Sequence, residues 1–115
     1  MLALRQSFDS EGNVVAGAFP QSDTIDALYF AAAGAQSDNV PAGARFVAVS
    51  LSAPVAAFLK MDGAAVVPAA NVSNGSASEA IPVGNAQPLV RELNGATTVG
   101  IAVGAACAAT LAYYA

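Results

Sequence analysis

The feature that most constrains the fold is the stretch of residues 97–115 (TTVGIAVGAACAATLAYYA), which carries no charged side chain. A membrane-spanning helix needs about 20 consecutive apolar residues, and a pair of buried β-strands also has no place for charges. The choice between these two structures decides the class of protein.

The periodicity of this stretch favours strands. Val99, Ile101 and Val103 alternate with small residues, and after a turn over residues 104–106 the alternation resumes through Leu111 and Tyr113. Many of the residues are β-branched, which suits strands better than helices. The Gly100 and Gly104 pair also fits the GxxxG pattern of membrane helices, so a membrane span is the alternative. We predict two buried strands, with the small-residue face covered by another sheet or another subunit.

Several other segments have the pattern of strands separated by turns. Residues 44–52 alternate after a turn entry at Pro41 and Gly43, residues 55–61 are a short apolar run, and residues 87–93 fit a strand that begins after Pro88. The dipeptides Asp62-Gly63 and Asn94-Gly95 are turn signals. We therefore predict a hairpin between residues 55–61 and 64–67, and a long loop over residues 68–85.

The N-terminal third is harder to interpret. Residues 24–33 fit a strand, with Ile25 and Tyr29 on one face, and this interpretation is favoured. The alternative is one short helix near residues 23–33, in which Asp23 caps the first turn. Residues 1–24 fit an extended N-terminal arm, with part of the sandwich as the alternative. Residues 1–12 also fit a first edge strand, and residues 13–19 fit a segment that pairs along a sheet edge. The prediction is an all-β chain forming one domain over residues 1–115, a small antiparallel β-sandwich or jelly-roll-like barrel.

Composition excludes several kinds of partner. Charged residues make up only 10% of the chain, the net charge is −4, and the four basic residues are scattered. Nucleic-acid binding needs clustered basic residues, so no nucleic-acid partner is expected. A surface with so few charges suits a protein packed against neighbouring proteins. The N-terminus lacks the basic and long apolar regions of a signal peptide, so no export signal is expected.

The residues that bear chemistry are few. The chain has no histidine, and its single cysteine, Cys107, lies in an apolar run and is interpreted as a buried thiol. Asp23 and Asp26 are the only close carboxylate pair, and they suit a helix cap or a solvated surface better than acid–base catalysis. Asp62 and Glu79 could offer loop oxygens to a cation, but they lack the DxDxDG-like spacing of a calcium-binding loop. We expect no catalytic, cofactor-binding or metal-binding residues, no cofactor, and no enzymatic activity.

Four aromatic residues permit two interpretations. A platform for stacking sugars or bases is one, and packing in the core or in an interface is the favoured one, because these residues alternate with alanine and valine. The four are Phe46, Phe58, Tyr113 and Tyr114.

The order of turns and strands from residue 40 onward resembles that of small virion structural proteins of tailed bacteriophages, of the capsid decoration (cement) type. The resemblance rests on residues 40–51, 57–61, the Asp62-Gly63 turn, residues 64–82 and residues 97–114. It implies an all-β subunit on the capsid surface, assembled in the host cytoplasm. It also implies homo-oligomers, with a trimer favoured, that bind the major capsid protein or another virion protein and do not bind membranes.

Two other functions stay open at this point. One is a carbohydrate- or receptor-binding β module on a virion surface. The other is a small membrane protein anchored by residues 97–115.

Overall fold

A computed structural model describes residues 1–5, 10–12, 19–83 and 88–115. These residues form eight β-strands and no helix. The strands are β1 (Ile25–Phe30), β2 (Gly34–Asn39), β3 (Phe46–Leu51), β4 (Ala57–Met61), β5 (Glu79–Ala80), β6 (Leu89–Glu92), β7 (Thr98–Val103) and β8 (Cys107–Tyr114).

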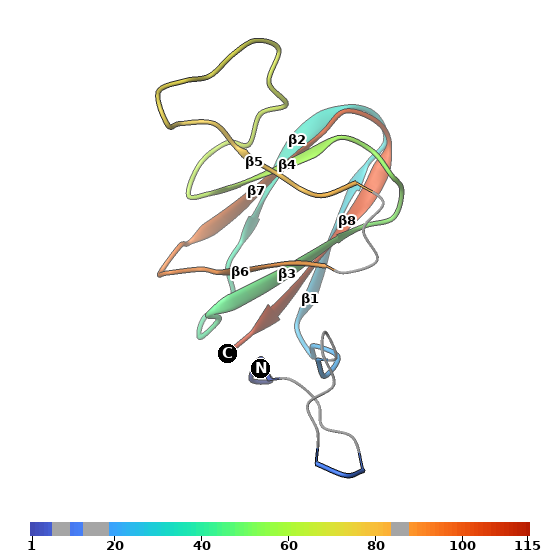
Figure 1. The fold of residues 1–115 in the computed structure, drawn as a ribbon, viewed down its shortest axis with the longest axis vertical. Helices are drawn as coiled ribbons and strands as arrows, with labels where there is room; N and C mark the ends of the chain where they lie inside the picture. The colour runs from blue at the N-terminus through green and yellow to red at the C-terminus, as the bar shows by residue number, and fades with distance from the viewer. Residues whose placement is uncertain (6–9, 13–18, 84–87) are drawn as a thin grey trace.

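The strands form two four-stranded sheets packed face to face (Figure 1). One sheet has the order β1-β8-β3-β6 and is called the β8 sheet below. The other has the order β2-β7-β4-β5 and is called the β7 sheet. All the strand pairs are antiparallel.

The two sheets are the halves of one long antiparallel ribbon folded across its middle. Phe30 pairs with Cys107 in the β8 sheet, and Gly34 pairs with Val103 in the β7 sheet. The segment that joins β1 to β2 is therefore as long as the segment that joins β7 to β8, and the two segments cross between the sheets in the same register. The pairing of β8 with β3 continues into that of β7 with β4 in the same way. Eight strands in this order form a jelly roll, which confirms the predicted all-β sandwich and specifies its topology.

The terminal stretch lies at the centre of the fold. β7 lies between β2 and β4, and β8 lies between β1 and β3. Val99, Ile101, Leu111 and Tyr113 point into the space between the sheets and are fully buried. Burying a side chain of this size stabilises the fold by about 1.5–3 kcal/mol. The predicted pair of strands is confirmed, and the membrane-helix alternative for residues 97–115 is wrong.

The second face of β7 is covered by the chain itself. A Cβ atom placed on Gly100 would lie 2.6 Å from the carbonyl oxygen of Gly63 and 3.1 Å from the amide nitrogen of Ala65. The backbone that leaves β4 therefore lies directly on Gly100. The sequence predicted a small-residue face under another sheet or subunit, and at Gly100 the covering element is instead this loop.

The hairpin predicted between residues 55–61 and 64–67 is wrong. β4 pairs with β7 on one side and with β5 on the other, so neither edge of β4 is free for residues 64–67. The turn at Asp62 serves another purpose. With a φ of 52° it reverses the chain, and its Oδ1 accepts hydrogen bonds from the backbone N–H groups of Thr97 and Thr98 at 2.7 and 3.2 Å.

The favoured strand near residues 24–33 is confirmed as β1, and the alternative helix near residues 23–33 is wrong. Alternate residues, Leu28 and Phe30, point inward, while Ile25 and Tyr29 point outward. The chain then crosses to the other sheet through residues 31–33 and continues as β2. No sequence pattern predicted β2, whose residues are mostly polar and exposed.

The turn at Asn94-Gly95 is confirmed. Both residues have positive φ, at 51° and 79°, and the N–H of Ala96 donates to the carbonyl of Leu93 at 3.0 Å. This is the two-residue turn that the dipeptide predicts, but it joins strands of different sheets, β6 and β7.

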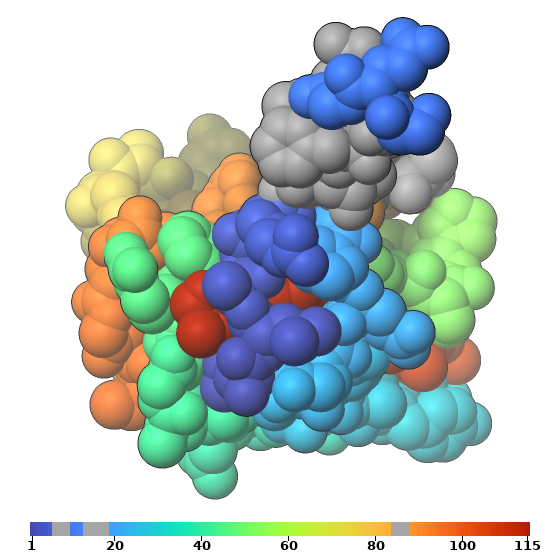
Figure 2. All heavy atoms as spheres, turned by 90° about the horizontal axis from the view of Figure 1, so that it is seen from below, coloured from blue at the N-terminus to red at the C-terminus, as the bar shows by residue number. Residues whose placement is uncertain are grey.

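The two ends of the chain lie side by side. The N–H of Leu4 donates to the carbonyl of Ala115, and the N–H of Ala115 donates to the carbonyl of Leu2 at 2.8 Å. Figure 2 shows the dark-blue N-terminal residues over the red C-terminal end. Of the edge segment predicted over residues 13–19, residues 13–18 lie outside the described part of the chain.

Candidate interaction surface

The outward face of the β8 sheet presents side chains from three adjacent strands. Because side chains alternate along a strand, the register places Ile25, Ala27 and Tyr29 of β1 on this face. Beside them lie Ala108, Thr110 and Ala112 of β8, followed by Phe46, Ala48 and Ser50 of β3. We call these nine residues the outer face.

The outer face carries no charged side chain. Tyr29 is 73% exposed and Ile25 is 46% exposed, which is unusual for large apolar side chains on a sheet that is otherwise packed. Charged groups begin only at its rim, where Arg45 lies 4.0 Å from Glu92 and stacks over the Phe46 ring at 5.5 Å. A charge-depleted centre with a charged rim is the usual composition of a surface that binds another protein.

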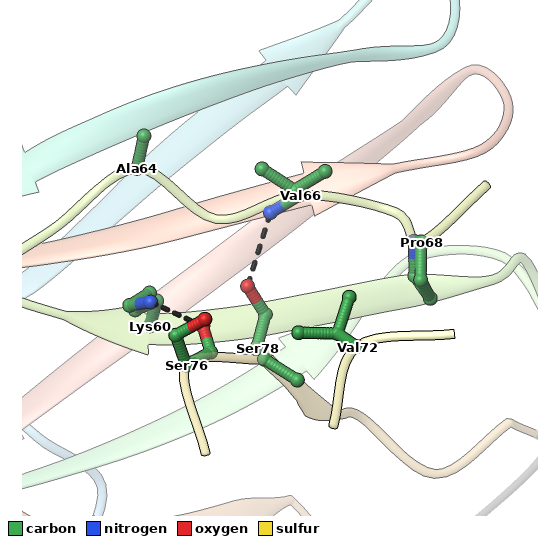
Figure 3. Close-up of a pocket in the computed structure, with 8 residues that line it drawn as sticks. Lys60, Ala64, Val66, Pro68, Val72, Ser76 and Ser78 are labelled. Carbon is green, nitrogen blue, oxygen red and sulfur yellow. Dashed lines mark hydrogen bonds between the residues drawn. The ribbon is translucent and has the colours of Figure 1, made fainter. Parts of the chain in front are cut away.

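A loop after β4 adds a second exposed region. The first residues of this segment, which covers residues 64–78, pack on the sandwich, where Ala65 is 3% exposed, and the yellow part that follows projects from it (Figure 1). Val66 and Val72 are 61% and 47% exposed. A hollow with a volume of about 210 Å³ lies between this loop and Lys60. Figure 3 shows the residues that line it. The Lys60 ammonium donates to the carbonyl of Ser76, and Ser78 accepts a hydrogen bond from the N–H of Val66, so the hollow is held open by the loop's own contacts.

Asp23 and Asp26, the carboxylates that lie close together in the sequence, have different partners in the structure. Asp23 and Asp26 do not form a pair. Asp23 lies 3.7 Å from the N-terminal ammonium of Met1 and bonds to Thr24, and its pKa is lowered chiefly by that Thr24 hydrogen bond.

Asp26 instead faces Asp38, which comes from the opposite sheet. Burial is the main cause that raises the pKa of Asp38, and its hydrogen bond with the Asp26 carboxyl raises it further. The hydroxyl of Tyr113 donates to Oδ2 of Asp38 at 2.7 Å. Burial raises the pKa of Tyr113 as well, and the Asp38 carboxylate adds to that effect. This cluster links β1, β2 and β8 at the open side of the sandwich, and burial together with the neighbouring Asp26 carboxyl disfavours the charged form of Asp38.

Asp62 and Glu79, considered as cation ligands, are each used within the fold. Asp62 binds the backbone of Thr97 and Thr98, and these hydrogen bonds lower its pKa, with the Thr97 backbone bond contributing most. Glu79 forms a bidentate ion pair with Arg91 through Nε at 2.9 and 3.0 Å and also through Nη2. Within the described ranges no group of three or more metal-binding side chains is present.

The remaining candidates are buried. Cys107 lies in the core, where burial raises the pKa of its thiol, so it is poorly suited to act as a nucleophile. Tyr113 is fully buried and Tyr114 is 5% exposed, so neither can stack on a ligand. Core packing, the favoured interpretation, is confirmed for Tyr113. Tyr114 is also buried, on the outward side of β8, where its hydroxyl donates to the carbonyl of Pro20 at 2.7 Å. Among the described residues the exposed aromatic residue is Tyr29, which its alternation with Ile25 on a strand could have revealed.

The described residues contain no helix long and apolar enough to cross a membrane. Comparisons with protein-family models, with curated proteins and with solved structures find no match for this chain.

Proposed function

We propose that this protein is a structural virion subunit that decorates or cements a phage capsid through non-catalytic contacts, as a homo-oligomer on the capsid surface. The observation that carries the proposal is the uncharged outer face, which spans three strands and exposes Tyr29 and Ile25 beside small side chains, although Ala48 near its centre is buried. The partner is the major capsid protein or another virion protein. Assembly takes place in the host cytoplasm.

The physical demands of such a role suit this surface. A subunit that binds many equivalent sites on a shell needs modest affinity at each site, because repeated contacts add up when subunits are joined. Small side chains allow close approach over a wide area, and the absence of charge avoids the cost of removing charges from water. The resemblance to decoration proteins supports the same role independently of the outer face.

The test is co-sedimentation with assembled capsids of the phage whose genome encodes the chain, beside unassembled major capsid protein. Wild-type protein is expected to pellet with capsids. Thr110→Lys places a charge at the middle of the outer face and is expected to weaken binding at least about tenfold. Val66→Lys places the same charge on the projecting loop and serves as the matched control. Failure of the wild-type protein to bind capsids would overturn the proposal.

A carbohydrate- or receptor-binding module is the second candidate, because Tyr29 offers an exposed ring beside the small residues of the outer face. A glycan array distinguishes the two functions. Binding that Tyr29→Ala abolishes would favour this module, and an array without signal would favour the capsid role.

A further inference from the structure

The outward edge of β1 has the properties of a strand built to pair with another strand. In β1 the N–H and C=O groups of alternate residues point either toward β8 or away from it. The N–H of Tyr113 donates to the carbonyl of Thr24 at 2.9 Å, so residue 24 and every second residue after it face β8. Ile25, Ala27 and Tyr29 therefore direct their backbone groups away from the sheet.

These edge groups are largely unused within the described part of the chain. One hydrogen bond reaches them, from the Gln36 side-chain amide to the carbonyl of Tyr29 at 2.6 Å. A carbonyl oxygen has two lone pairs, so that group can accept a second hydrogen bond. The edge is six residues long and carries neither proline nor lysine, the residues that commonly block edge pairing.

The opposite side of the sandwich is protected. β5 and β6 are only two and four residues long, and Pro82 and Pro88 lie in the connection between them. The Glu79–Arg91 ion pair joins the two strands across the sheets. Short strands, charges and prolines are the usual means of preventing edge pairing, and β1 lacks them, apart from Asp26. That carboxyl points inward to Asp38, so it is held within its own sandwich.

We propose that β1 pairs antiparallel with β1 of a second copy of this chain, about a two-fold axis at Ala27. In this register Ala27 lies opposite Ala27 of the second copy, and Ile25 lies opposite Tyr29. The outward backbone groups of the three residues then satisfy one another, and two Ile–Tyr cross-strand pairs form on the outer face. The β8 sheets of the two copies merge into one eight-stranded sheet with a continuous outer face.

A second copy of the chain fits this edge because the edge is self-complementary. Ile25, Ala27 and Tyr29 of one copy contact the same three residues of the other copy. An interface of this kind is isologous and closes as a dimer. This deepens the homo-oligomeric part of the proposed function, although the resemblance to decoration proteins favours a trimer. The dimer is measured without capsids, so its failure is distinguishable from failure of capsid binding.

The first experiment is sedimentation equilibrium of the full chain over a wide range of concentrations. Wild-type protein is expected to show a monomer–dimer equilibrium. Tyr29→Lys is expected to weaken association at least about tenfold, because a lysine on the edge disfavours pairing. Val66→Lys, at an equally exposed valine outside β1, is expected to associate like the wild type. A wild-type monomer at every concentration, a trimer, or a dimer unaffected by Tyr29→Lys would overturn the proposal.

The second experiment does not depend on disrupting the edge. In the proposed register the Cα atoms of the two Ala27 residues lie about 5.5 Å apart, within the range that a disulfide spans. Ala27→Cys is therefore expected to give a covalent dimer under mild oxidation, while Thr110→Cys, exposed on the same face but away from the edge, is not. Equal cross-linking of the two variants, or none in Ala27→Cys, would contradict the two-fold pairing.

Discussion

At the residue scale, Gly100 is the described glycine at which an added Cβ atom would lie closest to other atoms. The carbonyl of Gly63 and the amide nitrogen of Ala65 lie where a side chain would begin, and both are backbone atoms that cannot rotate away. The backbone at Gly100 does not have a positive φ, so conformation does not require glycine there. The lack of space for a Cβ atom does.

We predict that Gly100→Ala destabilises the protein by about 1–3 kcal/mol, because the added methyl group forces the loop off β7. Gly104→Ala is the matched control. Its Cβ would meet the Ala56 side chain at 3.5 Å, an ordinary contact, so its effect is expected to stay within about 0.5 kcal/mol. Urea unfolding of both variants measures the difference. Equal free energies of unfolding would show that the loop does not lie against Gly100.

Asp38 gives a pH dependence whose sign follows from its environment. Burial and Asp26 raise its pKa in the folded state above the ordinary 3.8, so the folded protein binds this proton more tightly than the unfolded chain does. The resulting stabilisation is fully present below pH 3.8 and is lost as the pH rises through the folded pKa.

Asp38→Asn is therefore expected to be more stable than the wild type at pH 7, with a difference that shrinks as the pH falls toward 3.8. The amide oxygen can still accept the Tyr113 hydroxyl. Asp62→Asn is the control of opposite sign: hydrogen bonds lower the pKa of Asp62, so this variant is expected to be less stable at pH 7 and to approach the wild type in acid. Urea midpoints across this pH range test both, and a pH-independent effect of Asp38→Asn would contradict the raised pKa of Asp38.

At the scale of elements, the two open sides of the sandwich are joined by different chemistry. Asp26 and Asp38 face each other between β1 and β2, and Glu79 and Arg91 form an ion pair between β5 and β6. The side chains of that ion pair are 42% and 45% exposed, so water competes with the contact.

We predict a small coupling energy between Glu79 and Arg91, about 0.2–1 kcal/mol, which decreases with added salt. A double-mutant cycle with Glu79→Gln, Arg91→Met and the combined variant measures it. A coupling above about 2 kcal/mol, or one insensitive to salt, would mean that the pair is more protected from solvent than its exposure indicates.

The elements also show where sequence patterns carry information. β3, β7 and β8 have one face of large apolar residues, and their period-2 alternation predicted them. β2 (GAQSDN) has no such pattern, because it is an edge strand whose residues are mostly exposed. β2 forms a strand because the antiparallel pairing of β1 with β8 continues as the pairing of β2 with β7. The same pairing brings Asp38 of β2 to Asp26 and Tyr113. No local signal could have identified this cluster.

At the scale of the whole molecule, every sheet depends on contacts between distant parts of the chain. β1 pairs with β8 and β2 pairs with β7, so the terminal stretch must be present before either sheet can form. Chains dominated by such pairings fold in milliseconds to seconds, more slowly than helical bundles.

We therefore predict that a chain truncated after residue 106 does not fold, because it lacks the strand between β1 and β3. Far-UV circular dichroism and urea unfolding test this, and a cooperative unfolding transition in the truncated chain would contradict it. The full chain is expected to refold on the millisecond-to-second timescale in stopped-flow experiments.

The sequence by itself determined the fold class, the two strands of the terminal stretch and the turn at Asn94-Gly95. Alternation of side chains and turn dipeptides act over a few residues, so they can be recognised locally. Only the tertiary structure decided which strands pair, that Asp62 binds Thr97 and Thr98 instead of closing a hairpin, and that Asp26 meets Asp38. It also decided what covers the second face of β7: at Gly100 it is the chain's own loop, because residues distant in sequence meet only after the ribbon has folded.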